Sequence, residues 1–159
     1  AREATSLYSS LRSGCNSLRI STGRMEYLQR EDRLCQACLS SGHSCVESEQ
    51  HFCLECPSLQ FDRSDMLRNI RQTSFQLEGQ LPFDPDGIVG FTSAQTFWDD
   101  HWLGMSPDSQ TDILLGGRTY PLESTTHTIP SSISDAVFET AIPALYNMSL
   151  VRGRSLRSN

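Results

Sequence analysis

The most informative segment of the chain is CQACLSSGHSCVESEQHFCLECP, which occupies residues 35–57. It holds five of the six cysteines in a chain of 159 residues. A disulfide-stapled secreted domain normally spreads its cysteines along the chain, whereas a tight cluster with CxxC spacing is typical of a metal site. The stretch therefore predicts a small zinc knuckle in a protein of a reducing, intracellular compartment, with nucleus and organelle both open.

The spacing of cysteine and histidine leaves two ligand sets open. Cys35 and Cys38 form a CxxC pair, whose turn presents two thiolates to one metal ion. Zinc takes four such ligands in a tetrahedron, and the second pair can lie well downstream. That pair is either His51 and Cys56, spaced H-x4-C, or Cys53 and Cys56, which form a second CxxC. Either set gives a closed structural site.

The remaining candidates in this stretch, His43 and Cys45, are less regularly spaced. The alternative to a metal site is a set of free thiols buried in the core, since cysteine packs well as a small apolar residue. A bound zinc ion explains the stretch better, because it holds few large apolar side chains of its own. Metal binding would then supply much of the local folding energy.

Helical patterns surround the cysteine-rich stretch on both sides. The periodicity of apolar residues and the capping signals predict helices over 5–22, 58–76, 92–103, 107–115 and 131–151. Pro143 should kink the last of these. Residues 81–87 are predicted to be a turn-rich linker and 118–130 a polar loop.

These patterns together predict a mainly α protein. We expect an irregular helical chain with long polar loops, and a CCHC zinc knuckle between the first and second long helices. Residues 1–76 would form a helix, knuckle and helix module, and 77–159 an acidic helical C-terminal region. No apolar run is long enough to predict a transmembrane helix.

Charge is unevenly distributed along the chain. Residues 1–71 hold nine arginines and nine acidic residues, whereas 72–151 hold one arginine and ten acidic residues. The net charge of the chain is -6. Proteins that bind duplex nucleic acid usually present a broad basic face, so the acidic second half argues against that class. Only the first half and the arginine-containing C-terminal tail could contact phosphates.

Residues 11–57 resemble the region downstream of the polymerase domain in LINE-type, non-LTR retrotransposon reverse transcriptases. The elements that carry the resemblance are Leu18–Arg19, Gly23–Arg24, Cys35 with Cys38, Val46–Glu47, His51–Phe52 and Cys56–Pro57. A weaker likeness continues through Arg63–Arg71, ILLGG at 113–117 and the helix ending near 154. The resemblance favours His51 over Cys53 as the third ligand. It also implies a non-catalytic accessory that helps to hold template RNA or target DNA.

Two functional hypotheses follow. In the first, the chain binds RNA or single-stranded DNA, and four arginines near the knuckle contact phosphates: Arg19, Arg24, Arg30 and Arg33. In the second, the module is a structural subunit of a larger protein assembly, with exposed Trp98 and Trp102 among its protein contacts. The spacing of these two tryptophans in FWDDHW also suits a helix face turned to the core, which is the reading we favour for that segment.

No catalytic constellation is visible in the sequence. Asp99 and Asp100 lie in a helical, aromatic context, unlike the paired aspartates that hold Mg²⁺ in a polymerase palm. His101 and His127 lack a cysteine or serine partner at a recognisable spacing. The calcium-loop pattern fails as well, because Val89 stands where glycine is needed. We therefore expect a protein that is not an enzyme.

Overall fold

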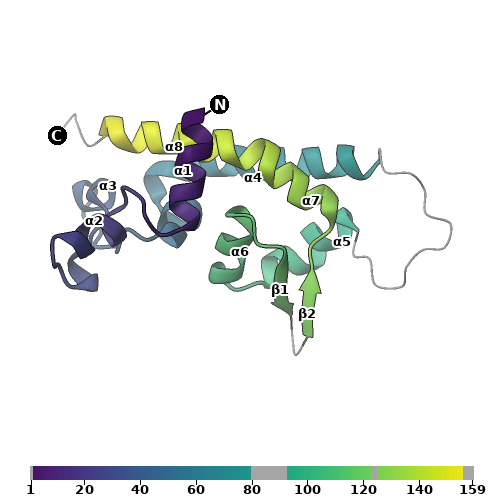
Figure 1. Ribbon diagram of the computed structural model, residues 1–159, viewed down its shortest axis with the longest axis horizontal. Helices are drawn as coiled ribbons and strands as arrows, with labels where there is room; N and C mark the ends of the chain where they lie inside the picture. The colour runs from purple at the N-terminus through teal and green to yellow at the C-terminus, as the bar shows by residue number, and fades with distance from the viewer. Residues whose placement is uncertain (1, 80–92, 123–124, 156–159) are drawn as a thin grey trace. The chain divides into compact units, whose positions relative to one another are not determined.

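The computed structural model describes residues 2–79, 93–122 and 125–155. It divides into two compact units, one formed by Ala1–Asp65 with Ile142–Asn159 and the other by Met66–Ala141. Helices dominate the described residues, whose only strands form one two-stranded hairpin, so the expectation of a mainly α protein is confirmed (Figure 1). The predicted linker at 81–87 lies outside the described residues.

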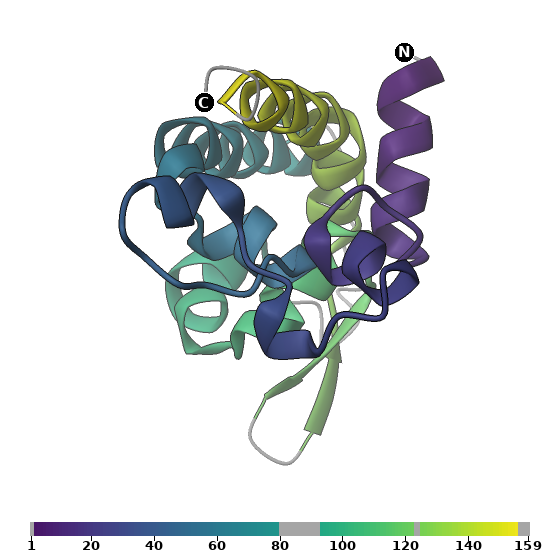
Figure 2. The same ribbon diagram turned by 90° about the vertical axis from the view of Figure 1, so that its left-hand side faces the viewer.

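The first unit is built from short helical pieces around the cysteine-rich stretch. Its elements are α1 (Arg2–Arg12), α2 (Arg19–Met25), η1 (Arg30–Asp32), α3 (Gln36–Ser40), η2 (His51–Glu55), η3 (Pro57–Leu59), the start of α4 (Gln60–Glu78) and α8 (Ile142–Ser155). Helix α1 packs against α8 (Figure 2). The Tyr146 hydroxyl donates a hydrogen bond to Glu3 at 2.5 Å. The two ends of the described chain thus belong to the same unit.

The helix predicted over 5–22 is wrong, because the chain breaks into α1 and α2. Gly14 adopts a left-handed φ of 67°. The Gly14 N–H bonds to the Leu11 carbonyl and the Cys15 N–H to the Ser10 carbonyl, the pairing of a Schellman C-cap. Glycine suits that position because it has no Cβ to clash. The left-handed residue ends α1, even though the apolar periodicity runs on past Gly14.

The second long helix, α4, follows the knuckle as predicted. It runs over Gln60–Glu78, against an expected 58–76, and is preceded by the single turn η3. Pro57 opens that turn, where its missing N–H costs nothing. The predicted apolar side chains Leu59, Met66 and Ile70 are buried. The cysteine and histidine cluster therefore lies in the chain between α1 and α4, the first two long helices.

The second unit has its own aromatic core. Its elements after α4 are α5 (Ala94–Thr96), η4 (Phe97–His101), η5 (Trp102–Gly104), α6 (Pro107–Leu114), β1 (Thr119–Leu122), β2 (Thr125–Thr128), α7 (Ser131–Ala136) and η6 (Val137–Ala141). Phe97 stacks edge-on against Trp98 and against Tyr120, with ring centroids 5.3 and 5.7 Å apart. Ser93 and Ser106 cap α5 and α6, because the Ser93 hydroxyl accepts the Thr96 N–H and the Ser106 hydroxyl accepts the Ser109 N–H.

The burial of the tryptophans decides between their two interpretations. Trp98 and Trp102 are 6% and 7% exposed, so the prediction that they face the core is confirmed. Trp98 also donates its indole N–H to the Ser74 hydroxyl at 3.0 Å. The alternative, in which both are exposed contacts for a protein partner, is wrong.

Most of residues 118–130 lie in the two strands β1 and β2, so the prediction of a polar loop there is wrong. Strands β1 and β2 are antiparallel, with Tyr120 opposite His127. Tyr120 is fully buried, while Thr119 and Pro121 on either side are exposed, so β1 has the alternation of a half-buried strand. The segment is rich in threonine, which favours strands. Its overall polarity is typical of a loop, and the prediction followed the polarity.

The last predicted helix, over 131–151, forms in three pieces. Helix α7 passes into the π-turn η6, and α8 then begins at Ile142. Pro143 lacks an N–H and disfavours a regular helix in the turn before it, so an irregular turn at this point is expected. Phe138 lies in this turn and is 64% exposed, although the apolar periodicity of 131–151 would place it on the inner face of a regular helix.

Candidate metal centre

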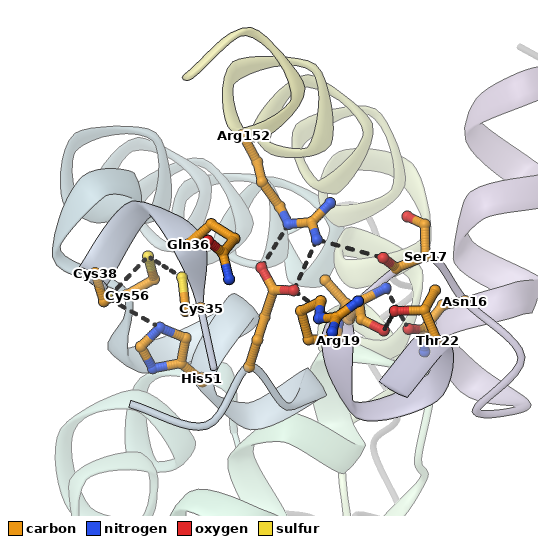
Figure 3. A network of polar contacts seen from close by, with 12 residues as sticks. Asn16, Ser17, Arg19, Thr22, Cys35, Gln36, Cys38, His51, Cys56 and Arg152 are labelled. Carbon is orange, nitrogen blue, oxygen red and sulfur yellow. Dashed lines mark hydrogen bonds and ion pairs between the residues drawn. The ribbon is translucent and has the colours of Figure 1, made fainter. Parts of the chain in front are cut away.

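Four ligand atoms converge in the first unit. The donor atoms of Cys35, Cys38, His51 and Cys56 all lie within 4.8 Å of one another, and all four residues are buried (Figure 3). The structure thus brings together the first of the two predicted ligand sets. Cys53 is buried as well but is not part of this group.

The distances within the cluster suit a tetrahedral metal ion. The Cys56 sulfur lies 4.0 Å from that of Cys35 and 3.9 Å from that of Cys38. The Cys38 sulfur lies 3.3 Å from His51 Nε2. Tetrahedral zinc with Zn–S bonds of about 2.3 Å places its sulfurs about 3.8 Å apart. The cluster can therefore hold a metal ion with only small adjustments.

Local backbone geometry presents the first pair of ligands. Leu34 and Val46 form an antiparallel bridge, and the Cys35 N–H bonds to the Cys45 carbonyl at 2.8 Å. This bridge closes the loop between the two halves of the knuckle. Cys35 then precedes α3, whose first turn carries Cys38, so both thiols lie on one side of that turn.

A π-turn presents the second pair of ligands. The Cys56 N–H bonds to the His51 carbonyl at 2.7 Å, which is a bond between residues five apart. The H-x4-C spacing has the same separation, so this wide turn brings the imidazole and the thiol to one side. The Ser48 hydroxyl accepts the N–H of His51 at the start of the turn (3.1 Å).

Two charged side chains lie beside the cluster. The Nδ1 atom of His51 lies 3.8 Å from a carboxylate oxygen of Glu55, which leaves Nε2 facing the sulfurs. A carboxylate behind a ligating imidazole is the usual second partner in zinc sites. Arg63 donates to the Cys56 carbonyl at 3.1 Å and so places a positive charge beside the cluster.

The sulfur atoms are close enough to compete for protons. The hydrogen bond with Cys35 lowers the pKa of Cys56 to about 3, against the opposing effect of burial. The same bond raises the pKa of Cys35, and burial raises that of Cys38 to about 11. A metal ion must displace the remaining thiol protons, so metal binding here releases protons and weakens in acid. By contrast, burial raises the pKa of Cys53 to about 12, which marks an inert thiol.

An ion pair that the sequence did not predict connects the knuckle to α8. Arg152 donates to both carboxylate oxygens of Glu47, at 2.6 and 2.7 Å, and Glu47 is only 3% exposed. The Arg19 N–H donates to the same carboxylate at 2.7 Å. The partners are 105 residues apart in the chain. A cavity of about 110 Å³ beside the pair is lined by Cys35, His51, Phe52, Leu59 and Val151 among others.

The four arginines predicted to contact phosphates have different surroundings. Arg19 forms a bidentate ion pair with Glu26, with both distances 2.9 Å. Arg33 is half-buried and donates to the carbonyls of Leu28 and Ile20. Arg24 and Arg30 are exposed. Among the described residues, no ion pair or hydrogen bond engages either of their guanidinium groups.

A comparison with protein-family models, curated proteins and solved structures gives no match to this chain. Among the described residues, no helix has the length and apolar character needed to cross a membrane.

Proposed function

We propose that this chain is a non-enzymatic zinc-knuckle module that binds RNA or single-stranded DNA. The observation that carries the proposal is the buried group of three thiols and one imidazole, Cys35, Cys38, Cys56 and His51. Thiolate and imidazole are the ligands that zinc prefers in tetrahedral structural sites.

The character of the site supports a structural role for the metal. Four protein ligands complete a tetrahedron and leave no position for a substrate or an activated water molecule. The backbone around the ligands is held by its own hydrogen bonds, and the Leu34–Val46 bridge closes the loop that carries Cys35 and Cys38. Zinc in such a site stabilises a loop and does no chemistry.

Charge and resemblance support nucleic acid as the ligand. The unit Met66–Ala141 contains three arginines and ten acidic residues, whereas the unit with the knuckle contains ten arginines and nine acidic residues. Arg24 and Arg30 lie in the second of these and are exposed. The likeness of residues 11–57 to the accessory region of retrotransposon reverse transcriptases points to the same ligand.

The salt dependence of binding tests this proposal. Fluorescence anisotropy of labelled single-stranded RNA and DNA should report binding that weakens with salt. Two phosphate contacts predict a slope of about -1.4 in log K against log salt concentration, because each contact to a single strand contributes about 0.7. The double variant Arg24→Glu with Arg30→Glu should lose most of the affinity.

A control variant with the same change in net charge shows whether a loss of affinity comes from lost phosphate contacts or from the net charge alone. Arg12 and Arg118 are exposed and lie in α1 and before β1. Changing both to Glu alters the net charge by the same amount and should leave affinity nearly unchanged. Absence of binding by the unaltered chain at low salt would rule out the nucleic-acid part of the proposal. Equal losses in the two double variants would rule out Arg24 and Arg30 as the contacts.

The alternative is a structural or accessory subunit of a larger protein assembly. One observation favours it: two large apolar side chains of the unit Met66–Ala141, Leu103 and Phe138, are 82% and 64% exposed. A protein partner that covers such side chains would remove their apolar surface from water. Purification from the native source should then recover a fixed partner at constant stoichiometry, and a chain that is monomeric and partner-free would contradict this alternative.

A further inference from the structure

The turn after α2 presents a tyrosine where glycine is the usual residue. The Leu28 N–H bonds to the Gly23 carbonyl at 2.9 Å and the Tyr27 N–H to the Arg24 carbonyl at 3.2 Å, which is the Schellman pairing. In that motif the penultimate residue adopts a left-handed conformation. Tyr27 has a φ of 57° and is the only non-glycine residue with a positive φ in the described part of the chain.

Tyr27 is therefore unfavourable in two independent ways. A left-handed backbone is strained for a residue with a bulky side chain. The ring is also 92% exposed, so it buries almost no apolar area in return. Neither feature helps this chain to fold, and strained residues of this kind cluster at functional sites.

The turn that carries Tyr27 is firmly held. Arg33 donates to the Leu28 carbonyl at 3.0 and 2.7 Å and to the Ile20 carbonyl at 3.1 Å. Its side chain packs over Gly23, where an added Cβ would lie 2.6 Å from Arg33 Cγ. The Arg33 side chain thus holds the turn in place, and the exposed Tyr27 ring stands on a preorganised backbone.

The charges near this ring suit a phosphate backbone. Arg24 and Arg30 stand three residues before and three residues after Tyr27, and both are exposed. The intervening acid, Glu26, is engaged by Arg19, whose bond holds its pKa below the usual range. Glu31 and Asp32 follow Arg30 and limit the local positive charge. Stacking must then supply much of any affinity, with charge as a second contribution.

We infer that Tyr27 is a stacking platform for one unpaired base, with Arg24 and Arg30 contacting the neighbouring phosphates. Sites for single strands combine an exposed aromatic ring with flanking cations in this way. Bases in a duplex are stacked on each other and unavailable to such a ring, so the site would distinguish single strands from duplexes. This inference rests on the proposed function and names the ligand class of the same surface.

The test compares variants of the full zinc-loaded chain. Tyr27→Gly removes the ring and suits the left-handed backbone, so the turn is retained. Tyr27→Phe keeps the ring and loses only the hydroxyl. The probe is a labelled single-stranded RNA of twelve nucleotides without self-complementarity, compared with its duplex. We expect Tyr27→Gly to weaken single-strand binding about tenfold, and Tyr27→Phe to change it less than about twofold.

A second exposed aromatic provides the matched control. Phe61 is 87% exposed and lies in α4, away from the α2 turn in the chain. Phe61→Ala should leave the affinity unchanged, and the salt slope of Tyr27→Gly should equal that of the unaltered chain. If the unaltered chain binds and Tyr27→Gly binds equally well, the inference is wrong while the proposed function stands. If the unaltered chain binds neither probe at low salt, both are wrong. Equal losses for single strand and duplex would also overturn the inference.

Discussion

At the scale of single residues, the comparison of His51 with Cys53 shows which buried side chain belongs to the candidate metal site and which only packs in the core. Both are buried in η2, two residues apart, and the spacing of the sequence admits either as the third ligand. Only His51 places its donor atom among the sulfurs of Cys35, Cys38 and Cys56. Spacing alone cannot make this choice, because it depends on the direction in which a π-turn points each side chain.

Substitution of these two residues should therefore have opposite effects on metal content. We expect Cys53→Ala to keep a full complement of zinc and to lose about 1 kcal/mol of stability through lost packing. His51→Ala should lose most of its metal after dialysis, since only three ligands remain. Elemental analysis of both purified variants checks this. Loss of metal from Cys53→Ala with retention in His51→Ala would reverse the assignment.

Tyr27 permits a second prediction at this scale. Replacement by glycine removes a left-handed strain that costs about 1–2 kcal/mol, against a loss of about 0.5–1 kcal/mol in backbone entropy. Tyr27→Gly should thus be as stable as the unaltered chain or more stable by about 0.5 kcal/mol. Urea unfolding followed by circular dichroism measures the difference. A loss above about 1 kcal/mol would show that the ring contributes to folding.

The four arginines show what the sequence hides at the residue scale. Their charge is visible in the sequence, but their partners are not. Arg19 and Arg33 lie among the same run of charged residues as Arg24 and Arg30, yet only the structure shows the first two engaged by a carboxylate and by carbonyls. Such contacts depend on how α2 and η1 fold back on each other, which no periodicity encodes.

At the scale of elements, a buried ion pair connects α8 to the knuckle. Glu47 has a side chain 3% exposed and Arg152 one 14% exposed, so both are largely removed from water. Removing a charge from water costs free energy, and the attraction between the two side chains offsets that cost only while both are present. Residue 152 lies far from the knuckle in the sequence, and this contact could not be predicted from local spacing.

Removal of one partner should be costly. We expect Arg152→Gln to lower the free energy of unfolding by about 3 kcal/mol, because it leaves a buried carboxylate without its cation. Adding Glu47→Gln should recover part of this loss. Chemical denaturation of the two single variants and the double variant measures the coupling, with Arg12→Gln in the exposed part of α1 as the control. Additive losses in the double variant would contradict a direct pair.

The elements also separate what was predictable from what was not. Helices α4 and α6 lie close to their predicted bounds, because serine or proline marks their starts and apolar residues repeat regularly within them. The break at Gly14 and the hairpin at Thr119–Thr128 were missed. In the first case apolar periodicity ran across a glycine cap, and in the second Tyr120 is buried between the exposed Thr119 and Pro121 of a largely polar segment.

At the scale of the whole molecule, each unit has its own source of stability. The unit Met66–Ala141 buries Phe97, Trp98, Trp102 and Tyr120 together. For the cysteine-rich stretch in the other unit, the low number of large apolar residues between 35 and 57 predicts that bound metal supplies much of the stability. Charge is also divided between the units: acidic residues outnumber arginines in Met66–Ala141, while the two are nearly equal in the other unit.

Metal removal should affect one unit and spare the other. The chain has two tryptophans, and both lie in Met66–Ala141, so tryptophan emission reports on that unit. After treatment with a chelator, we expect the amides of residues 35–56 to exchange with deuterium much faster, while the emission maximum stays constant. A red shift of the emission at the same chelator concentration would show that the second unit also depends on the metal.

The coordination shell of bound zinc distinguishes a knuckle of three cysteines and one histidine from every other arrangement. X-ray absorption at the zinc edge of the purified, zinc-loaded chain should show three sulfur ligands at about 2.3 Å and one nitrogen ligand at about 2.0–2.1 Å. Four sulfur ligands would contradict the assignment of His51, and a shell of oxygen ligands, or zinc well below one ion per chain, would contradict the knuckle itself.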